Sequence, residues 1–392
     1  MVCKELSELD DYMIPSAPAA LLKAVVLYAG VVVTHAYGTL DTTEETASTG
    51  SSSNTGSTGN TGSSSKTGST AGANKGKGGK GPSSLRSHRM LPSLSDQLAA
   101  AGGGIVLESW SNLPQGSGCG TSSILAGCLL EAVGEVMGRP FSRAGLVHSV
   151  LMVEQMLTTG GGWQDQVGAL TGGAKIGRSA AALPLHVSVE QITVDPAFYE
   201  TLNVHLVGVF TGRPRLARNL LQDVIRRWYS RLPEIVETAA ALTENAERAA
   251  EAFKAGDIVA LGESFSAYWA QKKRMAAGCE PTTVTEMMRV LEPHCHGMSM
   301  GGAGGGGFMF VIAKDTWGAD AASLGRMREV IRAGCDPSLV DVADLHLHTI
   351  RIDTTGPLVT RTMAKAAGES GESSESSEAG ASGASGASGA SG

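Results

Sequence analysis

Residues 113–123 read LPQGSGCGTSS, with glycines at positions 116, 118 and 120 and a run of hydroxyl side chains behind them. The following residues, ILAGCLLEAVGEVMG, have the apolar spacing of a helix from Ser122 to about Met137. Glycines remove Cβ atoms where a backbone must approach a ligand, and the free amides at the start of a helix attract anions. The segment alone fits a di- or triphosphate loop and a ligand-free strand-to-helix turn about equally well.

The loop differs from the common nucleotide-binding motifs. No lysine follows its last glycine, so it is not a Walker loop, and its spacing is not that of a dinucleotide fingerprint. The charge of a bound phosphate must therefore be neutralised by a metal ion or by side chains elsewhere. The Ser122 hydroxyl is well placed to bind Mg²⁺.

Two carboxylates follow the loop. Glu154 lies near the end of a helix that we expect to begin after the N-cap Ser142, and Asp165 follows in a turn within GGWQDQ. Alone, Glu154 would be read as an exposed helical carboxylate. Together the two acids and the hydroxyl-rich loop provide what phosphoryl transfer needs: a metal ligand, a base for the attacking hydroxyl and a phosphate cradle.

A third glycine cluster, GGAGGGG at 301–307, runs into FMFVIA, which we predict to be a strand. Just before it, GMSMG matches the GxSxG pattern of a hydrolase nucleophile around Ser299. Candidate triad partners follow in hydrolase order: Asp341 or Asp344, then His346 or His348. A nucleophile elbow needs a helix directly after the serine, so the apolar strand disfavours this reading.

Two histidine pairs raise the question of a zinc site. His294 with His296, and His346 with His348, could each place two imidazoles on one face of a strand. No third ligand of matched spacing is evident, so we interpret these residues as structural or surface histidines.

The remaining pattern mixes helices and strands without regular alternation, which predicts an α+β fold. We expect a buried helix leading into a strand within 24–33 and mainly helices over 216–275. Further strands are expected at 103–111, 185–195, 204–210 and 347–353.

Composition narrows the function classes. The Ser/Gly/Thr/Lys-rich insert at 48–82 and the Gly/Ser/Ala/Glu-rich tail at 366–392 are both expected to be disordered. The net charge of −7 argues against a nucleic-acid surface. Six cysteines without a CxxC pair fit a reducing, cytoplasmic setting, and the apolar stretch at 24–33 is too short to span a membrane.

Five blocks in order carry a family resemblance: LPQGSGCGTSSILAG, EQMLTTGGGWQDQVGAL, FTGRPRLARNLLQDVIRRWYSRLP, YWAQKKRMAAGCEP and GGAGGGGFMF. Together they resemble the GHMP kinase superfamily and, within it, the kinase portion of the L-fucokinases. The resemblance implies ATP- and Mg²⁺-dependent phosphorylation of L-fucose at its anomeric hydroxyl, giving L-fucose 1-phosphate for salvage toward GDP-fucose.

The resemblance also implies roles for individual residues. Asp165 would take the proton of the sugar hydroxyl, while Ser122 and Glu154 would bind the metal ion. The residues implied to bind the nucleotide are Pro114, Gly116, Ser117, Gly118, Cys119, Gly120, Thr121 and Ser122 of the loop, with Gly302, Gly304 and Gly305 of the third motif. The family normally has Leu or Ala where Cys119 stands.

The implied architecture is an N-terminal α+β domain at 1–47 and 83–195 and a ferredoxin-like domain at 196–365. The family's first motif, an Arg-Val/Ile-Asp segment followed by Gly-Gly-x-x-Asp, has no counterpart. We therefore expect an incomplete N-terminal domain, low activity of the isolated chain, and a missing N-terminal segment or fused nucleotidyltransferase region in a longer protein. A non-catalytic nucleotide-binding remnant and a kinase for another sugar, such as a heptose phosphate, remain alternatives.

Overall fold

The structure is a computed structural model that describes residues 2–34, 91–114, 116–158, 161–212, 218–360 and 362, without the side chains of 218 and 219. The predictions for the insert at 48–82 and the tail at 366–392 lie outside the described residues. Met1–Pro357 form one compact unit, and Leu358–Gly392 form a second. Within the described ranges, no helix is both long and apolar enough to cross a membrane.

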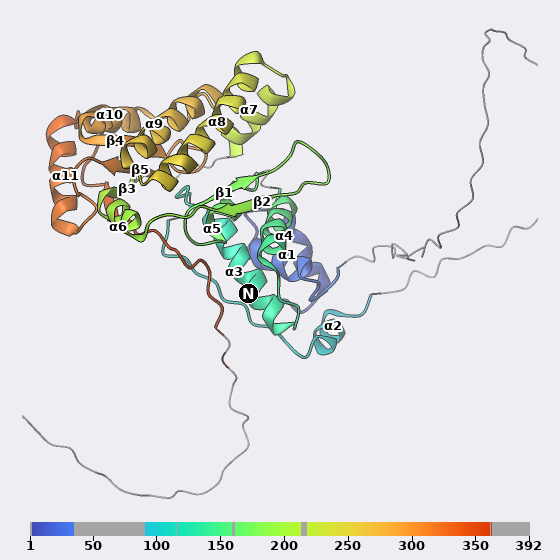
Figure 1. Cartoon of the computed structure of the whole chain (residues 1–392). Helices are drawn as coiled ribbons and strands as arrows, with labels where there is room; N and C mark the ends of the chain where they lie inside the picture. Colours follow the sequence, from blue (N-terminus) through green and yellow to red (C-terminus); the bar gives the residue numbers. More distant parts are fainter. Residues whose placement is uncertain are drawn as a thin grey trace, which may run out of the picture. The chain divides into compact units, whose positions relative to one another are not determined.

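The first half of the compact unit is a cluster of helices (Figure 1). Its core is formed mainly by α1, α3 and α4, which bury apolar side chains against one another, among them Val25, Leu130 and Val150. The elements are η1 (Leu6–Met13), α1 (Ala20–Tyr28), α2 (Leu94–Ala100), α3 (Thr121–Val136), α4 (Arg143–Met156) and α5 (Gln164–Ala169).

The two helices that follow from the sequence pattern form almost where expected. Helix α4 begins after Ser142, whose hydroxyl accepts a hydrogen bond from the amide of Gly145 at 3.1 Å. Helix α3 begins one residue before the predicted Ser122 and ends at Val136, so its first turn faces the glycine loop directly.

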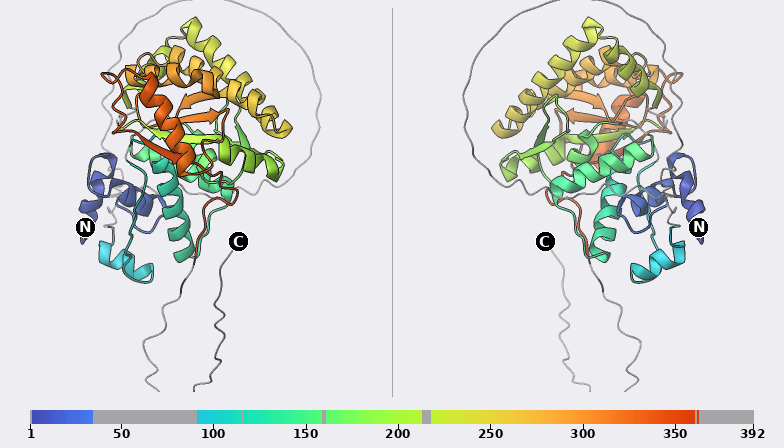
Figure 2. Two further views of the ribbon diagram at one scale, coloured as in Figure 1. Left: turned by 90° about the vertical axis from the view of Figure 1, so that its left-hand side faces the viewer. Right: turned by 90° about the vertical axis from the view of Figure 1, so that its right-hand side faces the viewer.

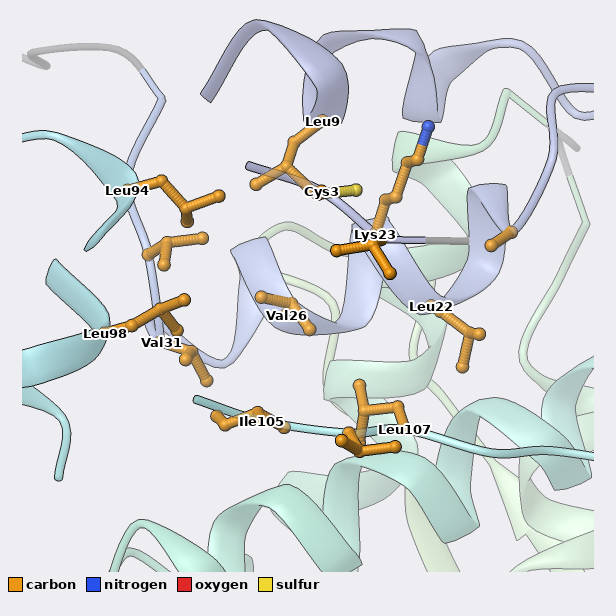
Figure 3. Close-up of a pocket in the computed structure, with 14 residues that line it drawn as sticks. Cys3, Leu9, Leu22, Lys23, Val26, Val31, Leu94, Leu98, Ile105 and Leu107 are labelled. Carbon is orange, nitrogen blue, oxygen red and sulfur yellow. The ribbon is translucent and has the colours of Figure 1, made fainter. Parts of the chain in front are cut away.

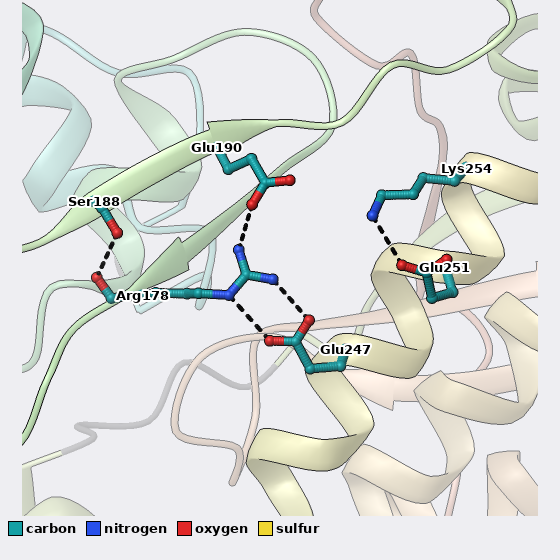
Figure 4. Close-up of polar contacts among 6 residues, drawn as sticks. All are labelled: Arg178, Ser188, Glu190, Glu247, Glu251 and Lys254. Atoms are coloured by element: carbon teal, nitrogen blue, oxygen red, sulfur yellow. Dashed lines mark hydrogen bonds and ion pairs between the residues drawn. The ribbon is translucent and has the colours of Figure 1, made fainter.

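A short antiparallel hairpin, β1 (Lys175–Arg178) and β2 (Ser188–Gln191), follows the helices. Figure 4 shows how Arg178 joins it to the next part of the chain. The guanidinium donates to Glu190 on β2 at 2.6 Å and, through two nitrogens, to Glu247 on helix α8 (Pro233–Ala255) at 2.7 and 3.1 Å. These groups are solvent-exposed, so their main effect is to fix geometry and their contribution to stability is small.

The second half contains a four-stranded antiparallel sheet in the order β4-β5-β3-β6. Its strands are β3 (Leu206–Phe210), β4 (Cys295–Met300), β5 (Phe308–Ala313) and β6 (His346–Thr349). Its helices are α6 (Pro196–His205), α7 (Arg218–Tyr229), α8 (Pro233–Ala255), α9 (Ile258–Met275), α10 (Thr282–Leu291), η2 (Glu292–His294) and α11 (Ala321–Gly334).

Helices α8 and α9 run side by side, and α9 packs on β4 (Figures 1 and 2). Their contact is unusually close, because a Cβ on Gly297 of β4 would lie 1.8 Å from the carbonyl oxygen of Gly262 on α9. Backbone therefore meets backbone there, and α9 is held firmly on the sheet. This fixes the side of α9 from which the Trp269 ring reaches Gly304 in the third glycine cluster.

Several predicted strands were wrong or too long. Residues 104–111 form neither helix nor strand and pair with no strand in the part of the chain that the structure describes, so the predicted strand at 103–111 was wrong. The helix within 24–33 is present as the end of α1, but residues 29–33 form no strand, and the strand predicted over 347–353 ends at Thr349. Strands β1 and β4 were missed, β4 because it is buried on nearly every residue and so shows no alternation.

One side of the segment at 104–111 faces an apolar cavity of about 370 Å³ (Figure 3). Ile105 and Leu107 line it together with side chains from η1, α1 and α2. Its one charged lining group, Lys23, is paired with Asp11 at 2.5 Å. The cavity therefore lacks the convergent polar groups of a phosphate or sugar site.

Candidate active site

The first glycine loop is a tight bend between the segment at 104–111 and α3. The amide of Ser117 donates to the carbonyl of Pro114 at 3.2 Å, which closes the bend. The loop glycines have φ angles of +74° at 116, +77° at 118 and +66° at 120. Residues other than glycine rarely adopt such positive φ angles, so the backbone shape itself requires the alternating glycines.

The loop side chains are tied to one another. The Ser117 hydroxyl is buried, lies 3.2 Å from the Thr121 hydroxyl and accepts from the Cys119 amide at 3.4 Å. Burial raises the pKa of the Cys119 thiol, which makes it a neutral, unreactive side chain here.

The third glycine cluster packs directly against the loop. The amide of Phe308 donates to the Ser117 carbonyl at 2.9 Å. A Cβ on Gly307 would lie 2.4 Å from that same oxygen, and one on Gly118 would lie 2.8 Å from the Gly301 carbonyl. The two glycine segments, far apart in sequence, thus meet backbone to backbone.

Of the three glycines predicted to bind nucleotide in the third motif, one contacts the first loop and two contact Cys279. Gly302 faces the loop, since its Cβ would lie 3.0 Å from the Cα of Gly118. Gly304 and Gly305 face the other way, and the Gly305 amide donates to the Cys279 carbonyl at 2.6 Å. The nucleotide-binding role of all three stays a prediction.

Glu154 is at the centre of a buried polar cluster and is not the exposed helical carboxylate that its position alone suggested. It is 6% exposed. Its carboxylate accepts hydrogen bonds from the hydroxyls of Ser122 at 3.1 Å and Ser123 at 2.7 Å and from the amide nitrogen of Gln166 at 2.7 Å. Burial raises the pKa of Glu154, and the serine and glutamine donors oppose that shift.

Asp165 lies in the first turn of α5 and not in a free turn, which corrects its predicted setting. Its Cβ is 3.3 Å from the position that a Cβ on Gly120 would occupy, so the carboxyl group borders the loop. Burial raises the pKa of Asp165 above its usual value, and the charge of Lys272 on α9 lowers it in part. Ser122, Glu154 and Asp165 are therefore gathered around one loop.

The donor set suits Mg²⁺ better than a transition metal. Among the described residues, no group of three or more His, Cys, Asp or Glu side chains could hold a metal ion. Magnesium commonly takes one or two carboxylates together with substrate phosphates, and Glu154 with the Ser122 hydroxyl offers hard oxygen ligands of that kind. Beside them, the buried Gln166 Oε1 has no hydrogen-bond partner among the described residues. The residues present therefore fit a magnesium ion.

Sequence reasoning missed two members of this cluster. Ser123 is fully buried and donates to Glu154 at 2.7 Å, and Gln166 entered the sequence analysis only as part of GGWQDQ. Helical spacing was the signal that could have found them, because it shows which polar residues share one face of a helix. In the structure α5 and α3 pack against each other, so their polar residues meet.

The competing hydrolase reading fails in the structure. Ser299 lies within β4, is 5% exposed, and its hydroxyl donates to the Met300 carbonyl at 3.2 Å. A nucleophile must stand exposed at a strand-to-helix turn. The described geometry provides no such turn at Ser299.

A larger cavity of about 910 Å³ lies beside the loop. Pro114 and Cys119 line it together with the aromatic rings of Phe210, Phe308 and Phe310. His346 and His348 also line it, so these two share a face of β6, which the sequence left open. The wall is mainly apolar and aromatic and provides no carboxylate for a metal ion.

Two protein-family models match parts of the chain. The model of the GHMP kinase N-terminal domain matches residues 88–173, and that of the GHMP kinase C-terminal domain matches residues 249–329. The first match contains the loop, Glu154 and Asp165, and the second contains the third glycine cluster.

Two curated proteins are similar in sequence. A bifunctional fucokinase/GDP-fucose pyrophosphorylase of Arabidopsis thaliana is 34% identical over 54% of this chain and 20% of its own length. An L-fucokinase/L-fucose-1-P guanylyltransferase of Bacteroides fragilis is 32% identical over 57% of this chain and 24% of its own length. The match thus spans about a fifth to a quarter of each relative.

Among solved structures, the galactokinase of Lactococcus lactis complexed with galactose is 16% identical, with a TM-score of 0.47, over 63% of this chain and 68% of that one. This likeness is weak, and the assignment rests on the sequence matches. Both domain models match in their order along the chain, and both curated relatives align at more than 30% identity, so residues 88–173 and 249–329 carry the N- and C-terminal GHMP kinase domains.

Proposed function

We propose that the chain transfers the γ-phosphoryl group of ATP to a hydroxyl of a free sugar. The observation that carries this proposal is the gathering of Ser122, Glu154 and Asp165 around one glycine loop, with Ser122 hydrogen-bonded to Glu154 at 3.1 Å. Phosphoryl transfer depends mostly on positioning and charge stabilisation, and this arrangement provides both.

The loop would hold the nucleotide phosphates. The free amides at the start of α3 face the bend, and the absence of side chains at 116, 118 and 120 lets phosphate oxygens approach the backbone. Ser122 and Glu154 would hold Mg²⁺, which supplies charge neutralisation on the phosphates when bound. The hydrogen bonds from Ser123 and Gln166 keep the Glu154 carboxylate oriented.

Asp165 would act on the sugar. As the sugar oxygen forms its bond to the γ-phosphorus, the bond from that phosphorus to ADP breaks, and the hydroxyl proton passes to the Asp165 carboxylate. Its raised pKa makes Asp165 a better proton acceptor than an ordinary aspartate, provided that it is ionised at the working pH.

We propose L-fucose as the sugar and its anomeric hydroxyl as the acceptor, so that the product is L-fucose 1-phosphate. The support is the identity to the two curated relatives, whose names include fucokinase activity. The chain corresponds to a small part of those proteins, so the substrate is argued from likeness and needs direct measurement.

An end-point assay tests this function, because it detects slow turnover as well as fast. The purified chain is incubated with MgATP and L-fucose, ADP is quantified, and ³¹P NMR locates the new phosphate ester. The expected result is sugar-dependent ADP with the ester at the anomeric carbon. An ester formed only with a heptose phosphate would change the substrate, and nucleotide binding without turnover on any sugar would contradict catalysis.

A further inference from the structure

The described part of the first loop contains no cation. Residues 116–122 are glycines, hydroxyl residues and one cysteine, and the acids gathered around them are Glu154 and Asp165. ATP would add several negative charges at the same place. One magnesium ion offsets only part of this charge, so a second source of positive charge is required nearby.

Lys272 is placed to supply it. This lysine lies in the last turn of α9 and is half-buried. It follows Trp269 by three residues, so the two side chains emerge on the same face of the helix. The Trp269 ring lies against the third glycine cluster, 3.1 Å from the position that a Cβ on Gly304 would occupy.

The segment after α9 strengthens this placement. The Cys279 carbonyl accepts from the Gly305 amide at 2.6 Å, which fastens the end of α9 to the cluster that touches the first loop. Burial raises the pKa of both the Cys279 thiol and the Asp165 carboxyl, and the charge of Lys272 opposes that rise in each. The ammonium therefore lies within electrostatic reach of both the third glycine cluster and Asp165.

Stabilising the end of α9 is a sufficient role for the neighbouring Lys273 and Arg274, but it does not explain Lys272. Lysines at the end of a helix stabilise its dipole, but Lys273 and Arg274 already do so from exposed positions. Lys273 also pairs with Glu280 at 3.0 Å. Across the described ranges Lys272 has no ion pair, although it is half-buried, and such burial disfavours a charge that has no partner.

We propose that Lys272 is a further catalytic residue, whose ammonium binds the phosphoryl group that passes from ATP to the sugar. The proposal rests on the function proposed above. In this step the phosphorus changes its bond from the ADP oxygen to the sugar oxygen, and the sugar proton goes to Asp165. The C-terminal half of the chain thus supplies the cation that the loop of the N-terminal half lacks.

Binding measurements test this without relying on turnover. Titration calorimetry compares a non-hydrolysable ATP analogue with ADP, both with Mg²⁺, for the unsubstituted chain, Lys272→Gln, Lys272→Arg and Lys273→Gln. Lys272→Gln should weaken analogue binding about 10-fold, with a smaller effect on ADP, because a hydrogen bond to a charged group is lost. Lys272→Arg should retain most of the affinity, and Lys273→Gln should equal the unsubstituted chain.

Turnover is the second measurement. Lys272→Gln should lower kcat for the sugar by at least about 10-fold, with little change in the sugar KM, because the interaction forms with the moving phosphoryl group. Thermal unfolding of each variant shows whether the fold is kept.

Equal behaviour of Lys272→Gln and Lys273→Gln in the calorimetry would overturn the role of Lys272. Absence of turnover in the unsubstituted chain, with the binding pattern intact, would count against the proposed function alone. Absence of binding to either nucleotide would overturn both.

Discussion

The two sides of the first glycine loop are built in opposite ways. On one side, α3, α4 and α5 bring side chains to the loop: the hydroxyl of Ser122 and the carboxylates of Glu154 and Asp165. On the other side, the segment between β4 and β5 offers only backbone, with Gly301 and Gly307 against the loop. The first side depends on the chemical groups of its side chains, whereas the second depends on having no side chain at the contact.

This difference sets what each side tolerates. A conservative change on the side-chain side keeps the shape and removes a proton acceptor or ligand, so it should affect chemistry more than stability. A single added methyl group on the backbone side forces the two segments apart, so it should affect stability and nucleotide binding together.

The largest effect is expected from Asp165→Asn. The amide keeps the shape of the carboxyl group but cannot accept the sugar proton, so kcat should fall about 10³-fold, within the range typical of general-base loss. The measurement is steady-state turnover with MgATP and the sugar, combined with calorimetry of nucleotide binding, which should change little. Asp10→Asn, at an exposed aspartate, is the control. An Asp165→Asn variant with normal turnover would remove Asp165 from the mechanism.

The same contrast explains how much the sequence could predict. Residue types were enough to select Ser122, Glu154 and Asp165 as candidates, and the structure gathers these three around one loop, while their roles stay predictions. They did not reveal that Glu154 is buried by Ser123 and Gln166, since that depends on how α3, α4 and α5 pack.

The backbone side was harder to predict. Glycines at 301–307 could be recognised only through a family resemblance, because backbone contacts leave no periodic signal. The expected strand at 103–111 failed for a related reason: alternation shows that a segment is extended and half-buried, but not that a partner strand exists to pair with it. Strand β4 was missed because both of its faces are covered.

The next largest effect is expected from Glu154→Gln. Loss of the carboxylate should weaken magnesium-dependent nucleotide binding by roughly 100-fold, the upper range for disturbed metal sites. Calorimetry of the ATP analogue with and without Mg²⁺ measures this, and Glu135→Gln on the far part of α3 is the control. A Glu154→Gln variant whose binding still depends on magnesium to the same extent would exclude Glu154 as a ligand.

In the absence of magnesium, Glu154→Gln should also change how the free energy of unfolding depends on pH. Because burial raises the pKa of Glu154 in the folded chain above 4.5, its value when unfolded, the folded state is favoured at low pH. That contribution is lost as the pH rises through the folded pKa. The glutamine variant lacks this loss, so its stability relative to the unsubstituted chain should increase with pH from about 4.5 upward, as measured by urea unfolding.

A smaller effect is expected from Gly118→Ala. Alanine here must adopt φ +77° and place its Cβ 2.8 Å from the Gly301 carbonyl oxygen. Gly138→Ala is the matched control, since Gly138 has φ +66° but nothing within 4 Å of its Cβ position. The backbone strain is similar in both, so the difference in their free energies of unfolding isolates the loop contact, at about 2 kcal/mol. Equal destabilisation of the two variants would show that the loops can separate freely.

The smallest effect is expected from Ser299→Ala. Ser299 lies on the strand that leads into the backbone side, and its one described hydrogen bond goes to the adjacent Met300 carbonyl at 3.2 Å. Its loss should change the free energy of unfolding by about 1 kcal/mol or less and leave turnover unaltered. A fluorophosphonate probe should fail to label the unsubstituted chain. Labelling of Ser299, or a loss of turnover in Ser299→Ala, would mean that the backbone side carries reactive chemistry, and the contrast between the two sides of the loop would no longer hold.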